Sequence, residues 1–280
     1  MTLQDYQHIA DFIAQRTRHR PRIAIVLGSG YGELADDIAD ADILSFDEIP
    51  GFQRSSVEGH RGRLVIGILE GAPLFVMQGR VHYYEGLSPE EATLPIRVMR
   101  CFGIETVILT NAAGGLNPSF HAGDLMLIED QINLVGLIGH NPLMGPNDPE
   151  LGPRFPDMVT VYDRRLRELA LAVAVELGQP LQRGVYVGLS GPAFETPAEV
   201  RFVRLIGGDA TGMSTSNEAL VARHGGMRVL GLSGISNVAV DVVDSPRITS
   251  HAEVLEAGKL IVPRMLALLR GLLRRWDEVA

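Results

Sequence analysis

Two short segments of the sequence carry side chains whose types and spacing suit a small anion. Ser29 stands between Gly28 and Gly30, directly after an apolar run. Glycine lets the backbone turn sharply and present N–H groups to an anion, and the serine hydroxyl is a further donor. Arg80 and His82 are separated by one residue, so on an extended segment both side chains point to the same side. A guanidinium fork beside an imidazole that can carry a positive charge suits a phosphate dianion.

Each of these segments also has a simpler explanation when it is taken alone. A tight turn accounts for the glycines, and Arg80 and His82 could be a surface arginine and a hydrogen-bonded histidine. A dinucleotide fits the first segment poorly, because the fingerprint G-x-G-x-x-G requires glycine where Glu33 stands. We therefore expect a small, locally recognised phosphate here, and the sequence disfavours a nucleotide-dependent oxidoreductase.

Two further segments end apolar runs with groups that can hydrogen-bond a ligand. The stretch from Asn111 to Gly115 consists of small residues that leave backbone amides open, although a packing loop has the same composition. Asn237 follows a buried run, and a buried amide must find partners for both its donor and its acceptor. It belongs either to a turn or to a ligand.

Glu195 lies in an apolar segment beside Phe194, just before a predicted helix. Its carboxylate could accept N–H donors from a flat ligand that the phenyl ring covers. An acidic residue at a helix N-terminus can also be an ordinary partner of the helix dipole. Met213, beside Ser214, fits the wall of a ligand site or the hydrophobic core.

The elements that must position these segments alternate as in an α/β fold. Short apolar, β-branched runs predict buried strands at 23–27, 64–69, 74–77, 107–110, 125–128, 185–189 and 229–232. Helical patterns cover 3–19, 89–101, 164–177, 196–206, 217–224 and 250–273. Because loops beyond the carboxyl ends of strands share one rim of such a sheet, we expect the polar segments to converge.

Local signals refine this arrangement. Capping boxes, Thr196 with Glu199 and Ser250 with Glu253, open two of the helices, and Pro21 stops the first. Only four residues separate the runs 64–69 and 74–77, which predicts a hairpin and hence a mixed sheet. The segment 139–158 is dense in Pro, Gly and Asn, so we expect a long loop that serves a site or an interface. No repeat or linker divides the chain, so we expect one domain over 1–280.

The composition excludes several classes of protein. The chain of 280 residues is 46% hydrophobic and 21% charged, which is too apolar for disorder and too charged for a membrane bundle. A net charge of -9 disfavours a protein that holds nucleic acid. With Cys101 as its one cysteine the chain can form neither an intrachain disulfide nor a Cys-rich zinc site. We expect a soluble, cytoplasmic protein without a signal peptide or membrane span.

Four motifs, in this order after Gly-Ser-Gly, carry a family likeness: MQGRVHYYEG (77–86), TNAAGGLNP (110–118), GPAFET (191–196) and GMSTSNEALVARH (212–224). They closely resemble purine nucleoside phosphorylases of the trimeric type, and the similarity runs from about residue 23 to residue 262. Several long motifs in the right order are far more specific than any single glycine loop.

The resemblance implies phosphorolysis, in which phosphate attacks C1 of a purine ribo- or deoxyribonucleoside, on a single α/β domain with a barrel-like mixed sheet. It implies a homotrimer and no metal or organic cofactor. The implied phosphate ligands are Ser29, Arg80, His82, the backbone of Ala112 and Ser214, with His60 close behind. The implied ribose contacts are Tyr84, Met213 and His251. The implied base contacts are Phe194, Glu195, Thr211 and Asn237, and Phe155 would reach into a neighbouring subunit's site.

The implied chemistry needs stabilisation of a positive sugar and a negative leaving purine, with no covalent enzyme intermediate. Asn237 would donate to N7 of the base and Glu195 would accept from its N1–H, while His82 helps to hold the phosphate. Adenine has a lone pair at N1, and a site that reads an N–H can reject the analogue that lacks it by ~10⁴ to 10⁵. We therefore expect inosine and guanosine as substrates and adenosine as a poor one.

Two residues depart from the family pattern and three other functions remain as alternatives. Thr211 stands where an apolar residue is expected and Val238 where many relatives carry Lys, which affects base preference and the lid expected at 240–250. A methylthioadenosine phosphorylase would typically carry Asp in place of Asn237 and an apolar residue in place of His251. The other two alternatives are a noncatalytic nucleoside-binding protein and a nucleosidase that uses water. Phosphate dependence distinguishes a phosphorylase from a nucleosidase.

Overall fold

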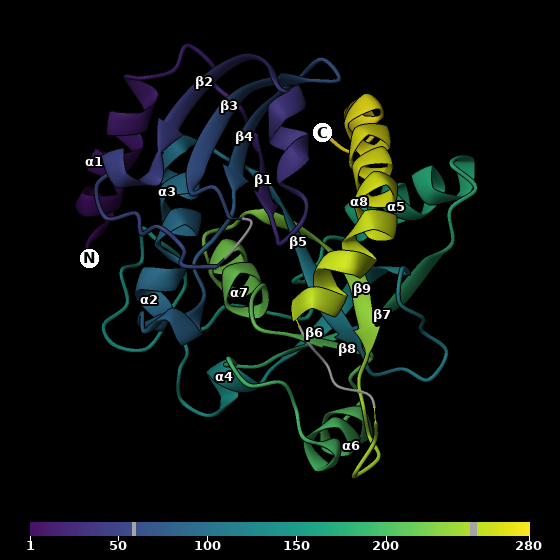
Figure 1. The fold of residues 1–280 in the computed structure, drawn as a ribbon. Helices are drawn as coiled ribbons and strands as arrows, with labels where there is room; N and C mark the ends of the chain where they lie inside the picture. The colour runs from purple at the N-terminus through teal and green to yellow at the C-terminus, as the bar shows by residue number, and fades with distance from the viewer. Residues whose placement is uncertain (58–59, 247–250) are drawn as a thin grey trace.

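A computed structural model describes residues 1–57, 60–246 and 251–280 of the chain. Its centre is strand β5 (Thr106–Gly115), which pairs with β1, β8 and β9 (Figure 1). The remaining strands of the described chain are β1 (Ile23–Leu27), β2 (Ala39–Ser45), β3 (Arg63–Leu69), β4 (Ala72–Gln78), β6 (Leu125–Asn133), β7 (Leu181–Gly188), β8 (Ala210–Gly212) and β9 (Arg228–Val238).

The strand order is β2-β3-β4-β1-β5-β8-β7-β6-β9, and β9 pairs back onto β5. Strands β5, β8, β7, β6 and β9 therefore close into a barrel, from which β1, β4, β3 and β2 extend as an open sheet. The sheet is mixed, since β1 pairs parallel with β4 and β5 while β3 pairs antiparallel with β4. These observations confirm the predicted α/β fold with a barrel-like mixed sheet.

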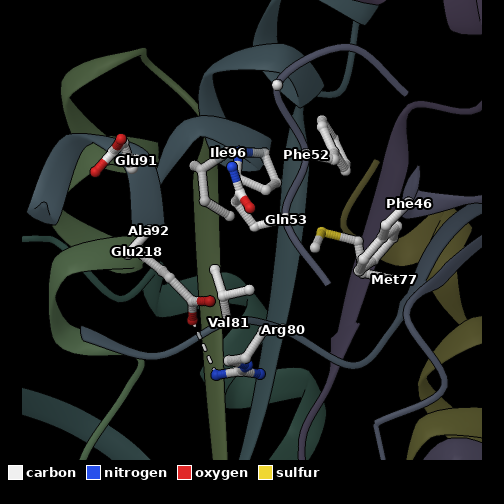
Figure 2. A pocket seen from close by; sticks show the side chains of 12 residues that line it. Phe46, Phe52, Gln53, Met77, Arg80, Val81, Glu91, Ala92, Ile96 and Glu218 are labelled. Atoms are coloured by element: carbon white, nitrogen blue, oxygen red, sulfur yellow. Dashed lines mark hydrogen bonds and ion pairs between the residues drawn. The ribbon is translucent and has the colours of Figure 1, made fainter. Parts of the chain in front are cut away.

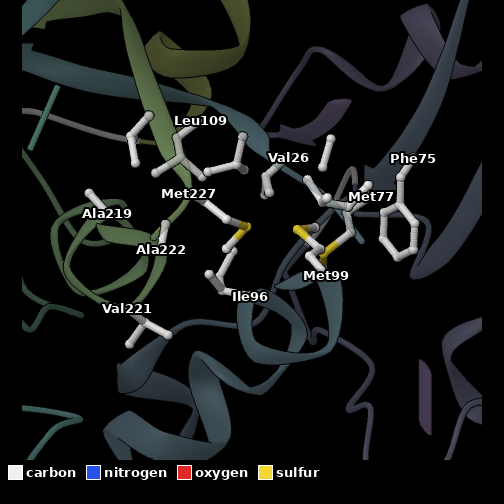
Figure 3. Packing of buried hydrophobic residues seen from close by; sticks show 14 of the residues in the cluster. Val26, Phe75, Met77, Ile96, Met99, Leu109, Ala219, Val221, Ala222 and Met227 are labelled. Carbon is white, nitrogen blue, oxygen red and sulfur yellow. The ribbon is translucent and has the colours of Figure 1, made fainter. Parts of the chain in front are cut away.

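Helices cover both faces of the sheet. The helices are α1 (Leu3–Ala14), α2 (Pro89–Ala92), α3 (Leu94–Phe102), α4 (Leu134–Leu137), α5 (Arg164–Glu176), α6 (Pro197–Leu205), α7 (Ser216–His224) and α8 (His251–Arg274). Ala24 and Val26 of β1 pack in one buried cluster with α1, α3 and α7, while Ile25 and Leu27 pack in another with α5 and α8. A fully buried strand whose side chains alternate between two helical layers reads as a continuous apolar run, which is why β1 was predictable. Figure 3 shows the first cluster, in which Met77, Met99 and Met227 lie close together between strands and helices.

The hairpin expected between the runs 64–69 and 74–77 is present. Leu69 faces Ala72, so Glu70 and Gly71 form the turn. Both have positive φ, 50° and 81°, as a two-residue turn that matches strand twist requires. The carboxylate of Glu70 accepts hydrogen bonds from Arg270 and Arg274 and so ties the turn to α8.

Several predicted boundaries are wrong. The helix predicted for 3–19 ends at Ala14, because basic side chains fold back onto its last turns: Arg16 donates to the Phe12 carbonyl and Arg20 to the Ala14 carbonyl. The helix predicted for 89–101 divides at Thr93 into α2 and α3. The short elements β2, β8 and α4 were not predicted, because they lack a long apolar period.

The segments 111–115 and 236–237, predicted to be loops, continue strands β5 and β9. These two strands pair in parallel, and the register shifts where Ala113 faces Ile235 and Gly114 faces Asn237. Ser236 is therefore an extra residue in β9, a β-bulge, and bulges re-aim the side chains beside them. The rest of the predicted rim holds: residues 28–30, 79–82 and 213–215 follow β1, β4 and β8 as irregular segments.

The long loop expected at 139–158 is irregular, as predicted. Helix α8 begins at His251, but Ser250, its expected cap, lies outside the described residues, as do residues 247–250 of the expected lid. Within the ranges described above, no helix is both long and apolar enough to cross a membrane.

Candidate active site

One cavity, of about 300 Å³, opens where β1, β4, β5, β8 and β9 end or bend. Residues from all of the polar segments line it together, so the predicted convergence is confirmed. The predicted site residues on its wall are Ser29, Arg80, His82, Tyr84, Ala112, Phe194, Glu195, Thr211, Met213, Ser214 and Asn237.

Three predicted residues do not line this cavity. His60 is buried behind it, where Nε2 lies 3.0 Å from Ser29 Oγ. Phe155 is 87% exposed on the surface of the long loop. The side chain of His251 lies outside the part of the chain that the structure describes, so its position relative to the cavity is not assigned.

Ser29 reaches the cavity because β1 comes very close to β5 at Gly28. The Gly28 N–H donates to Thr110 Oγ1 at 3.1 Å. A Cβ at Gly28 would lie 2.6 Å from the Thr110 carbonyl oxygen, so any larger residue would push the strands apart. The Gly-Ser-Gly segment is thus required for close strand approach as well as for the turn.

Arg80 is buried and most of its donors are bound to the protein itself. Its NH1 donates to Glu218 Oε2 at 2.9 Å, an ion pair that Figure 2 shows as a dashed line, and to Thr215 Oγ1 at 3.3 Å. Its NH2 donates to the carbonyls of Val26, at 3.2 Å, and Thr110, at 2.5 Å. Its Nε is buried and has no hydrogen-bond partner among the described residues. The free two-pronged fork expected from the sequence is therefore absent in this arrangement.

Behind this ion pair lies a second, much smaller cavity, of about 10 Å³, whose lining is shown in Figure 2. Phe52, Met77 and Ile96 form its apolar part. Such a volume is at the lower limit for a single water molecule. Glu218 therefore lies between a ligand-sized cavity and the core, and burial raises the pKa of its carboxyl while Arg80 opposes that shift.

His82 is held between Glu85 and Tyr84. Its Nδ1 lies 3.2 Å from Glu85 Oε1, and its ring stacks on Tyr84 with centroids 4.8 Å apart and planes 12° apart. Burial, together with electrostatic repulsion from Arg80 and, to a smaller extent, His60, lowers the pKa of His82 to about 4. The imidazole is therefore neutral at pH 7, whereas the sequence suggested that it could be a cation.

Glu195 and Thr211 form the opposite end of the cavity. Thr211 Oγ1 donates to Glu195 Oε1 at 3.2 Å. Burial raises the pKa of the Glu195 carboxyl, and the hydrogen bond from Thr211 opposes that change. The threonine that departs from the family pattern is thus a direct partner of the carboxylate. Phe194, beside Glu195, is 45% exposed and can cover a flat ligand.

Asn237 enters the cavity through the β-bulge at Ser236. The Ser236 hydroxyl donates to Asn237 Oδ1 at 2.9 Å, so the amide nitrogen Nδ2 is the end directed away from Ser236. A Cβ at Gly114 would lie 3.7 Å from that nitrogen, which places Nδ2 over the glycine-rich end of β5. A donor so placed can bind an acceptor atom of a ligand.

Sequence reasoning missed the partners of these side chains. Glu218, Glu85, Thr215 and Ser236 each hold a cavity residue in place, yet none was singled out. Glu85 has a usable signal, because it stands three residues after His82 in a tight segment. Glu218 has a weaker one, since it directly precedes the apolar run 219–222 of α7. In the described residues no group of three or more His, Cys, Asp or Glu side chains is arranged to hold a metal ion.

Comparisons with known proteins agree with this geometry. Residues 22–274 match the sequence profile of the Phosphorylase superfamily. The chain is 49% identical over 271 residues to purine nucleoside phosphorylase 1 of Bacillus subtilis, covering 97% of this chain and 98% of that protein. Crystal structures of Schistosoma mansoni purine nucleoside phosphorylase in complex with inosine and with adenosine each match with a TM-score of 0.94 and 40% identity. Each match covers 98% of this chain, together with 98% of the chain in the inosine complex and 99% of the chain in the adenosine complex.

The buried ion pair makes a testable contribution to stability. In Glu218→Leu the Arg80 guanidinium, which cannot lose its proton, stays buried without a carboxylate, and we expect the free energy of unfolding to fall by about 3–5 kcal/mol. The double variant Arg80→Met/Glu218→Leu removes both charges and should recover most of that loss. Urea denaturation at pH 7 gives the free energy of unfolding of the parent, the single variant and the double variant. An equal loss of stability in both variants would contradict the pairing.

Proposed function

The chain belongs to the purine nucleoside phosphorylase family of the Phosphorylase superfamily, and from this premise we propose that it catalyses the reversible phosphorolysis of inosine and guanosine. The products are a free purine and ribose 1-phosphate, or deoxyribose 1-phosphate from a deoxynucleoside, as purine salvage requires. One observation carries the proposal: a single cavity joins an end suited to phosphate, around Ser29 and Ser214, to an end suited to a 6-oxopurine, around Glu195 and Asn237.

At the phosphate end, Ser29, Ser214 and the backbone N–H of Ala112 supply neutral donors. Arg80 supplies a fixed positive charge whose Nε–H has no partner in the described chain. Glu85 Oε1 accepts from His82 Nδ1, which leaves Nε2 for the phosphate. A bound dianion favours the protonated imidazole, so we propose that His82 becomes a donor to phosphate only when phosphate is present.

At the base end, Glu195 accepts from N1–H of the purine and Asn237 donates to N7. As the glycosidic bond breaks, negative charge builds on the purine, and the Asn237 donor stabilises that charge. The sugar becomes positively charged at the same time and faces the phosphate dianion, which needs no enzyme nucleophile. Phe194 covers the base, and Thr211 orients the Glu195 carboxylate and favours its ionised form.

The ribose would lie between these ends against Tyr84 and Met213, with His251 near its 5′-hydroxyl. We propose that residues 240–250 act as a lid over this part of the cavity. No organic cofactor or metal takes part in the proposed reaction. Asn237 argues against the alternative of a methylthioadenosine phosphorylase, which would typically carry Asp here; with Oδ1 bound by Ser236, its Nδ2 is available as a donor.

We also propose a cytoplasmic homotrimer in which Phe155 completes the cavity of a neighbouring subunit. Support comes from the exposure of Phe155, 87%, and of Val159, 90%, along one irregular segment. Two large apolar side chains exposed four residues apart on one irregular segment are consistent with a contact surface.

The direct test of the reaction is the release of hypoxanthine from inosine with and without phosphate, with adenosine and methylthioadenosine alongside. We expect release only with phosphate, and slow release from the other two, because each lacks the N1–H that Glu195 reads. Release without phosphate would identify a nucleosidase, and no release from any substrate would leave a binding protein.

The hydrogen bond from Thr211 makes the acid limb of the pH profile testable. Glu195 must be ionised to accept N1–H. Because its pKa is raised, kcat/KM for inosine begins to fall at a higher pH than the ordinary pKa of a glutamate when the pH is lowered. In Thr211→Val the carboxylate loses a donor that lowers its pKa, so we expect the acid limb to move upward by roughly one pH unit. Inorganic phosphate titrates identically in assays of the parent and of Thr211→Val, so it cannot cause a difference between them. An acid limb at the same pH in both proteins would contradict the role of Thr211.

Removing the Phe155 ring tests the contribution of the neighbouring subunit. In Phe155→Ala we expect the KM for inosine to rise roughly tenfold or more, because an aromatic wall of the nucleoside site is lost. Sedimentation velocity should give a trimer for the variant and the parent. Val159→Ala, from the same exposed segment, is the matched control and should keep the parental KM. An unchanged KM in Phe155→Ala, or a fully active monomer, would refute the proposal.

A further inference from the structure

The backbone at Thr215, directly after Ser214, adopts an unusual turn. Its φ and ψ are 64° and -52°, and the N–H of Ser216 donates to the carbonyl of Ser214 at 2.7 Å. This is a γ-turn with positive φ, a conformation that is rare and strained, most of all for a β-branched residue. Such strain persists only where the surroundings over-determine it, and it concentrates at functional sites.

Thr215 is also the N-cap residue of α7, but its hydroxyl makes no capping hydrogen bond to the helix within the described chain. A threonine at this position ordinarily accepts an N–H of the first helical turn. Here the hydroxyl is turned toward the strands, where Oγ1 lies 2.9 Å from Asn111 Nδ2, 3.3 Å from Arg80 NH1 and 3.1 Å from Ser214 Oγ. In this strained turn the Thr215 hydroxyl therefore makes three contacts at the phosphate end of the cavity and no capping hydrogen bond to α7.

The direction of these hydrogen bonds follows from counting donors and acceptors. A hydroxyl has one hydrogen and two acceptor positions. The Asn111 nitrogen Nδ2 and the Arg80 guanidinium can only donate to Thr215, and they fill both acceptor positions. The hydrogen of Thr215 must then go to Ser214 Oγ, so Ser214 accepts from Thr215 and its own hydrogen points elsewhere.

The amide orientation of Asn111 supports this direction. Asn111 is buried, and its Oδ1 has no hydrogen-bond partner among the described residues. If the amide were flipped, its NH2 group, with two N–H donors, would occupy the buried position where Oδ1 now has no partner. Leaving two buried donors unpaired costs more free energy than leaving one acceptor unpaired. The observed orientation is the one that occupies the second acceptor position of Thr215.

We propose that Thr215 is a positioning residue: its hydroxyl orients Arg80 and keeps the Ser214 hydroxyl a hydrogen donor toward the phosphate subsite. The inference rests on the proposed function, since it assigns phosphate to the cavity end that Ser214 lines. Without the Thr215 hydroxyl, Ser214 loses its incoming hydrogen bond and Arg80 loses one of the contacts that hold its NH1. Binding of phosphate is weakened while the nucleoside end is unaffected.

The test compares Thr215→Val, which keeps the shape and β-branching but removes the hydroxyl, with Thr215→Ser, which keeps the hydroxyl. We expect Thr215→Val to raise the KM for phosphate roughly tenfold with little change in the KM for inosine, and Thr215→Ser to stay within about twofold of the parent. Parental activity that is independent of phosphate would refute the proposed function itself. Parental phosphate dependence with an unaltered phosphate KM in Thr215→Val would refute only the role of Thr215.

Two further variants separate positioning from folding. Thr17→Val removes another buried threonine hydroxyl, which accepts the His19 N–H far from the cavity, and should leave both KM values unchanged. If Thr215→Val does not fold, Asn111→Ala tests the same chain of hydrogen bonds from its other end. It frees one acceptor position of Thr215, so the Ser214 hydrogen can turn inward, and we expect a severalfold rise in the phosphate KM. An equal rise for phosphate and inosine, or failure of Thr215→Ser to preserve the phosphate KM, would overturn the proposal.

Discussion

The parallel pairing of β5 with β9 is the constraint on which the rest of the structure depends. β5 belongs at once to the open sheet, through β1, and to the barrel, through β8 and β9. The strand therefore brings the Gly-Ser-Gly turn, the segment at Ala112 and the bulged end of β9 to one place. Backbone hydrogen bonds fix this register, and the irregular segments that carry most of the cavity side chains are held in place where they leave the ends of the strands.

The two ends of the cavity are built differently. At the phosphate end, polar groups are paired inside the protein: the Arg80 guanidinium with the Glu218 carboxylate, and the neutral His82 imidazole with Glu85. At the base end, the Glu195 carboxylate is half-buried with one hydroxyl donor from Thr211. The first arrangement fixes positions before a ligand arrives. The second leaves a partly buried carboxylate that the hydrogen bond from Thr211 satisfies only in part and that can still accept from a ligand N–H. In the proposed reaction, selectivity for the base follows from this carboxylate, which the protein satisfies incompletely.

Much of this was accessible from the sequence, because buried parallel strands such as β1 are continuous apolar runs and because the site segments follow them. The motif resemblance then assigned the cavity residues, and the cavity brings eleven of them together. The features that could not be predicted from the sequence depend on contacts between residues far apart along the chain. Glu218 meets Arg80 across 138 positions, and the bulge at Ser236 exists only in the register with β5. Likewise, the left-handed turn at Thr215 contradicts the local preference of threonine and is imposed by tertiary contacts.

Closure of the barrel has a consequence for how the chain folds. The partner of β5 is β9, which is synthesised more than a hundred residues later, and Glu70 meets Arg270 across 200 positions. The first half of the chain can form its hairpin and early strand pairs, but its central strand keeps an unpaired edge until the last quarter emerges. Contacts so distant in sequence slow folding and leave apolar strand edges exposed in the meantime. During synthesis, the unpaired edge of β5 is therefore the part of the chain most open to pairing with other chains.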